Sequence, residues 1–449
     1  MAESLDTTHT PITLPVLLRL AGPVVVSRLG IMAMGIVDTI CVGRYSATEL
    51  GYHALGWAPT AVVLTTSIGL LSGVQVLTSQ AIGEGRLRET GAVLRRGIAY
   101  AFWVGIAAGL ILAGAGPFLL HHVGLADGLA NGASPVLVVF ALSLLPIFIG
   151  DVGIFWLEAH GRPVPGAVAM WAANIVNLLL NLWLVPGLSP FPVAGAVASA
   201  WATFVSRAAF MVFVAFAILQ WKKSRELGVL DPTPRDPPAS RQLRRIGYAA
   251  SLSYFVETAA FGGMTIVAGW IGAVQVAAWA IVLNVAATIF MVPLGLAVAT
   301  GVLVGRAYGA GDRAGVRRAG ILGFTATAVA MLVICAVIGI GNTLIASAYT
   351  LDPAVRAVAA GALLLSCLFY IADGLQVVGA QSLRAQSDIW VPTATHFFSY
   401  LVVMIPLCYV FALRMGGGVD GIVWGVAVAS LVSAGLLIGR FAWKVRRRV

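Results

Sequence analysis

Twelve apolar stretches take up almost the whole 449-residue chain and leave only short segments between them. A helix needs about 20 mostly apolar residues to cross a bilayer, and each stretch reaches that length. The stretches cover residues 13–36, 50–78, 92–116, 134–157, 164–186, 193–220, 244–270, 275–305, 317–346, 357–383, 391–413 and 419–442. The sequence therefore predicts an all-α membrane protein with twelve transmembrane helices.

Charged side chains are too few for a protein that folds in water. They make up 10% of the chain, whereas soluble domains carry about 25%. The first residues, MAESLDTTHTPITLP, are polar and acidic and lack the basic region and the small-residue cleavage site of a signal peptide. We therefore expect the first apolar stretch to stay in the protein as a transmembrane helix.

Basic residues lie on alternate loops and set the expected topology. They occur at Arg86, Arg88, Arg95, Arg96, Arg306, Arg313, Arg317 and Arg318, through the polar segment 221–243, and in the C-terminal KVRRRV. Two of the intervening loops, HHVGLADGLANGASP and PGLSPFP, contain no Lys or Arg. Since Lys and Arg collect in cytoplasmic loops, we expect both termini on the cytoplasmic side of a bacterial inner membrane. The net charge of +10 then follows from topology, and we expect no nucleic-acid partner.

The chain repeats itself at an offset of 226 residues. At this offset Gly83–Gly85 (GEG) aligns with Gly309–Gly311 (GAG), and matches extend from the first helix to the last. Each repeat holds six helices, an even number, so the two bundles are expected to be parallel repeats. We predict an N-terminal lobe at residues 1–220, a cytoplasmic linker at 221–243 and a C-terminal lobe at 244–449. Within the linker, DPTPRDPPASRQ is too proline-rich to be helical.

Three acidic residues fall inside predicted membrane helices: Glu257, Asp373 and Asp38. A charge at membrane depth is costly, so such residues are candidates for function. At the 226-residue offset Glu257 and Asp373 align with Ile31 and Ile147, so helix packing does not require an acid there. No Lys or Arg lies near them in the sequence at similar depth, which indicates that each is protonated or bound to a cation for part of a cycle. A carboxyl paired with a neighbour, or for Asp38 a helix-end carboxylate bonded to a loop, remains the structural alternative.

Further polar residues form one stripe on the fifth predicted helix. Asn174, Asn177 and Asn181 recur at spacings of three and four residues, which places them on one face. Such a stripe either joins helices or lines a cavity. Phe261 and Tyr400 add aromatic surface suited to organic cations, and we expect these five residues to line a substrate cavity.

Other residue types give weaker indications. The four cysteines lie in or beside apolar stretches without metal-ligand spacing, so we expect small buried hydrophobic residues and no cofactor. Asp151 and Glu158 are weaker acidic candidates, and Arg28 and Arg207 either reach to the membrane interface or pair with them.

Several segments together resemble a known family. VDTICVGR, GLLSGVQVLTSQAIGEGR, NIVNLLLNLWLV followed by PVAGAVASA, and the segments around Glu257 and Asp373 resemble the multidrug and toxic compound extrusion (MATE) family, NorM-type branch, over about residues 13 to 440. The resemblance implies two V-shaped six-helix bundles and export driven by sodium or proton influx. It also implies that Glu257 and Asp373 form the cation site of the C-terminal lobe, holding Na⁺ if coupling uses sodium, and that Asp38 is functionally important.

We accordingly predict a cation-coupled antiporter, not an enzyme, that exports hydrophobic organic cations by alternating access of its two lobes. We expect a monomer in the lipid bilayer that needs only Na⁺ or H⁺ as coupling ion. A flippase of the same superfamily for lipid-linked saccharides stays open, although such proteins usually have additional helices or several cavity arginines. An intramembrane transferase would need a clustered acid, histidine or metal motif, and the histidines are scattered.

Overall fold

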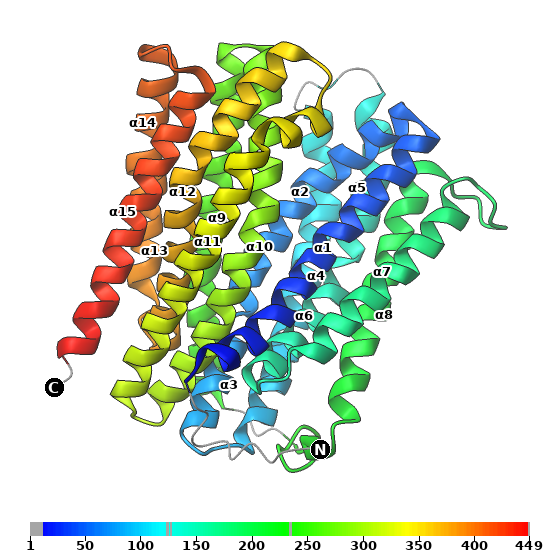
Figure 1. The fold of residues 1–449 in the computed structure, drawn as a ribbon. Coiled ribbons are helices and arrows are strands. Elements are labelled where there is room, and N and C mark those ends of the chain that lie inside the picture. Colours follow the sequence, from blue (N-terminus) through cyan, green and yellow to red (C-terminus); the bar gives the residue numbers. More distant parts are fainter. Residues whose placement is uncertain (1–11, 123–124, 126–127, 233–235, 448–449) are drawn as a thin grey trace. The chain divides into compact units, whose positions relative to one another are not determined.

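The computed structural model describes residues 12–122, 125, 128–232 and 236–447, and across them it contains helices and no strands (Figure 1). The first part of the chain forms α1 (Leu14–Tyr45), α2 (Ala47–Leu71), α3 (Gly73–Gly83), α4 (Glu89–His122), α5 (Leu129–Leu142), α6 (Leu144–Ala159), α7 (Val164–Leu184), α8 (Gly195–Leu219) and the short η1 (Lys222–Ser224). The second part forms α9 (Pro237–Ile271), α10 (Ala273–Gly309), α11 (Arg313–Tyr349), α12 (Pro353–Ala385), α13 (Trp390–Phe397), η2 (Phe398–Met404), α14 (Ile405–Tyr409), η3 (Val410–Arg414) and α15 (Gly418–Arg447).

Within this described part, twelve segments are long and apolar enough to cross a membrane, which confirms the predicted fold class. Three of these spans combine several helices: Ala47–Gly83 joins α2 and α3, Leu129–Ala159 joins α5 and α6, and Trp390–Arg414 joins α13 to η3. Many helices extend beyond the apolar stretches, because polar residues continue the same helix outside the apolar part.

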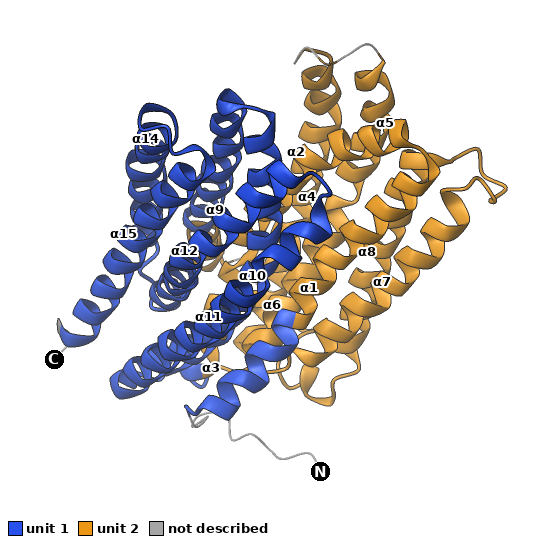
Figure 2. Ribbon diagram, turned by 45° about the horizontal axis from the view of Figure 1, so that its top comes forward, with its two compact units in different colours: residues 1–25, 83–85, 248–449 blue, residues 26–82, 86–247 orange. Residues whose placement is uncertain are grey.

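The chain divides into two compact units (Figure 2). The first unit comprises the residues up to Val25, Gly83–Gly85 and everything from Tyr248 onward. The second comprises Val26–Ile82 and Arg86–Gly247. The units largely follow the two halves of the chain. The exceptions are Gly83–Gly85 and two divided helices, α1, which is divided two residues after Pro23, and α9, which is divided after Gly247.

The segment that we expected to be a non-helical linker is helical in its second part. Residues 237–242 form the first turns of α9, so the prediction from proline content was wrong there. The Asp236 carboxylate accepts a hydrogen bond from the amide of Ala239 at 3.0 Å and caps the helix. Prolines are tolerated in the first turn because the first amide groups have no partner within the helix. Residues 233–235 lie outside the described part.

Helix ends recur at the 226-residue offset, as expected for a duplicated chain. α3 ends at Gly83 and α10 at Gly309, α6 ends at Ala159 and α12 at Ala385, and α7 begins at Val164 and α13 at Trp390. The turns repeat as well, because Gly161 and Ser387 both have positive φ, of 74° and 60°. Ser387 is the one described non-glycine residue with positive φ, at a position that favours glycine.

Candidate cation sites in the two units

The first unit brings Glu257 and Asp373 together, the two residues for which the family resemblance implies one cation site. Glu257 lies on α9 and Asp373 on α12, and each is 9% exposed. The Gln376 side-chain amide donates to Glu257 Oε1 and to Asp373 Oδ1, both at 3.2 Å. The Tyr400 hydroxyl lies 3.2 Å from the same oxygen of Glu257 and 3.5 Å from that of Asp373. Two carboxylates thus share the same two donors.

Local helix geometry positions these donors. Gln376 lies one turn after Asp373 on α12, so both side chains point to the same side. The Ser433 hydroxyl of α15 donates to Gln376 Oε1 at 3.3 Å, which leaves the amide nitrogen for the carboxylates. Tyr400 lies in the π-helical segment η2, and π-helical turns are rare and often occur at functional sites.

The chemistry of this pair is suited to a small cation. Two nearby carboxylates repel each other when both are charged, so a proton or a metal ion shared between them is stabilised. Oxygen ligands suit hard cations. In the described part of the chain, no three residues of the His, Cys, Asp and Glu types come together to hold a metal ion. The pair therefore offers oxygen ligands to a proton or a hard cation.

The structure also supplies a basic neighbour that the sequence did not indicate. Arg384, 3% exposed, interacts electrostatically with Glu257, and its guanidinium lies 5.7 Å from the ring centroid of Tyr254. Arg384 lies three turns from Asp373 along α12, which is too far along the sequence to indicate a pairing. The helix crossing that brings Tyr254 and Arg384 together is not visible in the sequence.

The second unit encloses Asp38, which is 1% exposed. Thr203 of α8 donates to Asp38 Oδ2 at 2.6 Å. The amides of Asn177 and Asn181 on α7 donate to Asp38 Oδ1 at 2.9 and 2.8 Å. Since all three partners lie on helices, the alternative of a helix-end carboxylate bonded to a loop is wrong. The sequence did not indicate Thr203, because threonine is common in membrane helices.

The asparagine stripe faces α1. Asn174 donates to the carbonyls of Gly30 and Met170 at 3.0 and 2.9 Å, and the other two asparagines bind Asp38. The stripe therefore joins α7 to α1, while the side-chain oxygens of all three residues are buried without a partner. That these residues also line a substrate cavity stays a prediction.

The aromatic residues predicted for the cavity lie beside the carboxylate pair. The ring centroid of Phe261 is 6.0 Å from that of Tyr400. Phe261 is half-buried, and Tyr400 is buried. The structure thus brings Phe261 and Tyr400 together with Glu257 and Asp373 in the first unit, whereas the asparagine stripe belongs to the second.

The remaining buried charges of the second unit neutralise one another. Arg28 Nη2 lies 3.3 Å from Glu158 Oε1, and both side chains are 2% exposed. The Gln75 amide donates to the other Glu158 oxygen at 2.9 Å. Asp151 interacts electrostatically with Arg28 and with Arg207. Of the two expectations for these arginines, the structure shows pairing with an acid for Arg28, whereas Arg207 interacts electrostatically with both Asp38 and Asp151.

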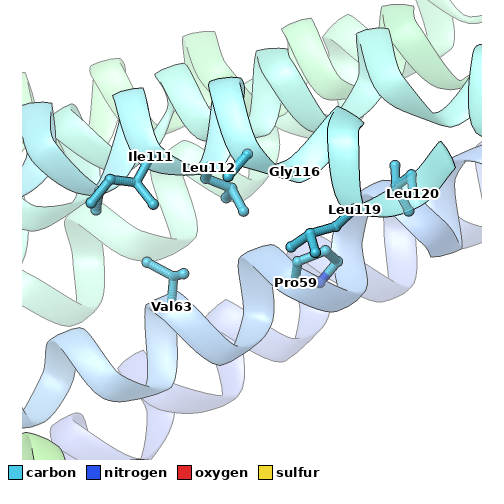
Figure 3. A pocket seen from close by; sticks show the side chains of 9 residues that line it. Pro59, Val63, Ile111, Leu112, Gly116, Leu119 and Leu120 are labelled. Atoms are coloured by element: carbon cyan, nitrogen blue, oxygen red, sulfur yellow. The ribbon is translucent and has the colours of Figure 1, made fainter. Parts of the chain in front are cut away.

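An apolar pocket lies between α2 and α4 in the second unit (Figure 3). Pro59 and Val63 line it from α2, and Ile111, Leu112 and Leu119 line it from α4. Its lining contains no charged or polar side chain, so it offers no ligand to a cation. The acids described above are therefore the candidate cation sites.

Sequence comparison connects this arrangement to one family. The chain matches the MatE family model twice, over residues 23–183 and 249–410. It is 51% identical over 434 residues to the "Probable multidrug resistance protein NorM" of Caulobacter vibrioides, covering 96% of this chain and 92% of that protein. It is 32% identical over 461 residues to the protein of the same name from Bradyrhizobium diazoefficiens, covering 96% and 94%.

Solved structures share the fold. One is described as the outward-facing conformation of a multidrug resistance MATE family transporter, with a TM-score of 0.90, 18% identity and 99% of both chains covered. Another, a transporter from Pyrococcus furiosus described as having a binding pocket of reverse polarity, has a TM-score of 0.88, 18% identity and 99% coverage of both chains. At these identities the likeness concerns the fold alone.

Proposed function

The chain belongs to the MatE family, and from this premise we propose that it is an antiporter that exports hydrophobic organic cations in exchange for H⁺ or Na⁺. The multidrug efflux role follows the names of its curated relatives. The coupling ion, the substrate class and the alternating access of the two lobes are our own proposals. We further propose that the protein works as a monomer in the bacterial inner membrane, with both termini in the cytoplasm.

The observation that carries the proposal is the shared pair of carboxylates in the first unit. Glu257 and Asp373 accept hydrogen bonds from the same two donors, Gln376 and Tyr400, in a buried site. A cation that binds there changes the net charge of a buried cluster. Such binding favours the conformation in which the carboxylates lie together, and differential binding of this kind is what allows an ion gradient to drive a conformational cycle.

Residues in both units suit a cationic substrate. Asp38 provides a buried negative charge, and Phe261 and Tyr400 provide aromatic surfaces, which attract organic cations. Transporters with parallel repeats commonly bind substrate near the membrane midplane and alternate access by movement of one bundle against the other. We propose the same cycle here, with Na⁺ held by Glu257 and Asp373 if sodium is the coupling ion.

A flippase for lipid-linked saccharides receives less support. Such a protein would need basic side chains that are available for a pyrophosphate group. In the second unit Arg28 is paired with Glu158, and Arg207 interacts with Asp151 and donates to the Ser143 hydroxyl at 2.6 Å. These two buried arginines are therefore already engaged by the protein's own side chains.

The test is uptake of ethidium, a fluorescent organic cation, by everted membrane vesicles. We expect uphill uptake when the vesicle lumen is made acidic or is loaded with Na⁺, and no such uptake by vesicles that lack the protein. Running the two gradients separately identifies the coupling ion. Uptake of an anionic dye without uptake of ethidium would contradict the proposed substrate class, and ethidium uptake that depends on neither gradient would contradict the coupling.

A further inference from the structure

Buried acids exceed buried arginines by one in each unit. Among the described residues, the buried Asp, Glu and Arg side chains are Glu257, Asp373 and Arg384 in the first unit, and Arg28, Asp38, Asp151, Glu158 and Arg207 in the second. When all of these side chains are charged, the buried residues of each unit carry a net charge of −1. In the second unit Arg28 forms a salt bridge with Glu158 and Arg207 interacts electrostatically with both Asp38 and Asp151, while Asp38 accepts hydrogen bonds from the neutral donors Asn177, Asn181 and Thr203.

We propose that Arg384 limits the Glu257–Asp373 site to one monovalent cation at a time. This inference rests on the proposed function, because it concerns the capacity of the same cation site. With Arg384 present, the empty cluster has a charge of −1, and one H⁺ or Na⁺ makes it neutral. A second cation would leave a net positive charge in the buried interior of a membrane protein, which is strongly unfavourable.

The position of Arg384 suits a counter-charge that acts through its field. Its Nε and Nη2 atoms are buried without a hydrogen-bond partner, and the guanidinium lies against Tyr254. Tyr254 comes one turn before Glu257 on α9, and Arg384 interacts electrostatically with Glu257 as well as with Tyr254. In a medium of low dielectric constant, such an interaction stays strong without direct contact. Arg384 therefore balances one carboxylate through its field, while Glu257 and Asp373 accept hydrogen bonds from the neutral donors Gln376 and Tyr400.

His396 is the other titratable basic group of this region. Both of its ring nitrogens are buried without a partner, its ring centroid lies 5.8 Å from that of Tyr400, and it interacts electrostatically with Arg384. Placing a second positive charge beside Arg384 in a buried site would be costly, so we count His396 as neutral. The other neighbours, Tyr254, Tyr370 and Tyr400, are phenols and add no charge.

Counting bound cations tests this inference on the full-length protein in lipid nanodiscs. Sodium binding is measured with ²²Na⁺. Proton binding is measured in sodium-free medium with a soluble pH dye, over the pH range in which the protein transports. Each count is the number of cations that a protein binds minus the number that the Glu257→Gln/Asp373→Asn double variant binds. This subtraction removes the contribution of all other titrating groups. We expect one cation for the wild type, two for Arg384→Met and one for Arg384→Lys.

Charge-restoring variants separate this role from a structural one. Asp373→Asn leaves Glu257 balanced by Arg384, so the count should fall to zero. Combining Asp373→Asn with Arg384→Met restores the net charge of −1, so the count should return to one. Arg440→Gln removes an arginine of the same unit that is bonded to Asp388 at 2.9 Å, and it should leave the count at one.

Two results would overturn the inference while leaving the proposed function in place: one cation bound by Arg384→Met, or one bound by Asp373→Asn alone. If Arg384→Met does not fold, the single variant Asp373→Asn decides, because it retains Arg384. If the wild type binds no more cations than the Glu257→Gln/Asp373→Asn double variant, the cation site itself is refuted, and with it the proposed coupling.

Discussion

Glu158 and Arg384 occupy the same position in the two repeats and carry opposite charges. Each is the second-to-last residue of its helix, since α6 ends at Ala159 and α12 at Ala385, and each is buried. Glu158 forms a salt bridge with Arg28, whereas Arg384 lies in the field of Glu257. The two units therefore place a buried charge at one shared point of the repeat and use it for different partners.

Breaking the buried pair in the second unit should destabilise the protein. Glu158→Gln leaves the charge of Arg28 buried without a counter-charge, and loss of one partner from a buried pair costs about 3–5 kcal/mol. We expect a clearly lower melting temperature in detergent, followed by tryptophan fluorescence. Glu89→Gln, which removes a partner from the exposed Arg86–Glu89 pair, should change stability by about 0–1 kcal/mol. Equal melting of Glu158→Gln and the wild type would show that the pair contributes nothing.

Thr203 should support the function of Asp38. Thr203→Val removes the 2.6 Å hydrogen bond to Asp38 Oδ2, and a hydrogen bond to a charged group contributes about 1.5–3 kcal/mol. We expect slower ethidium export at matched membrane abundance, and a stronger defect for Asp38→Asn. Thr66→Val is the control, because Thr66 is half-buried and donates to the Val62 carbonyl of its own helix. Export by Thr203→Val at the control rate would contradict a role for this bond.

The basic segment 221–243 should lie in the cytoplasm. In a variant whose four native cysteines are replaced, Lys223→Cys should react with a membrane-impermeant maleimide only when the cytoplasmic side is open to the reagent. Asn131→Cys, at the start of α5, should react only from outside the cell. Both side chains are exposed, so access to the reagent depends on the side of the membrane. The reverse pattern would invert the proposed topology.

Close packing of α11 against α10 should depend on Gly323. A Cβ atom at this position would lie 2.3 Å from the Thr300 hydroxyl, which is much closer than atoms can approach. Gly323→Ala should therefore destabilise the first unit by about 1–3 kcal/mol. Gly361→Ala on α12 is the control, because nothing lies within 4 Å of its added Cβ. A melting temperature of Gly323→Ala at or above that of Gly361→Ala would contradict this packing.

The fold was largely predictable because its signals are long and local. Twelve apolar stretches predict twelve spans, and a constant offset predicts repeated helix ends. Asp236 and the prolines after it show the limit of local rules, since a proline-rich segment is compatible with a linker and with the capped start of a helix.

The candidate sites were predictable only in part. Glu257, Asp373 and Asp38 are conspicuous because an acid in an apolar stretch is rare. Gln376 and Thr203 carry no comparable signal, because their importance comes from helices that approach each other across the bundle. Arg384 lies near a helix end, where basic residues are common, and only the tertiary structure relates it to Glu257.

The central claim is that Glu257 and Asp373 couple the driving cation to export. Removing either carboxylate's charge abolishes the differential binding that drives the cycle, so Glu257→Gln and Asp373→Asn should each stop uphill export. Asp420→Asn, which alters an exposed acid at the start of α15, should export normally.

The most direct measurement is ethidium uptake by everted vesicles under an imposed proton or sodium gradient, with each variant at matched membrane abundance and with the melting temperature of the wild type. We predict uphill uptake by the wild type and by Asp420→Asn, and none by Glu257→Gln or Asp373→Asn. Wild-type uptake by either carboxylate variant would contradict this coupling role.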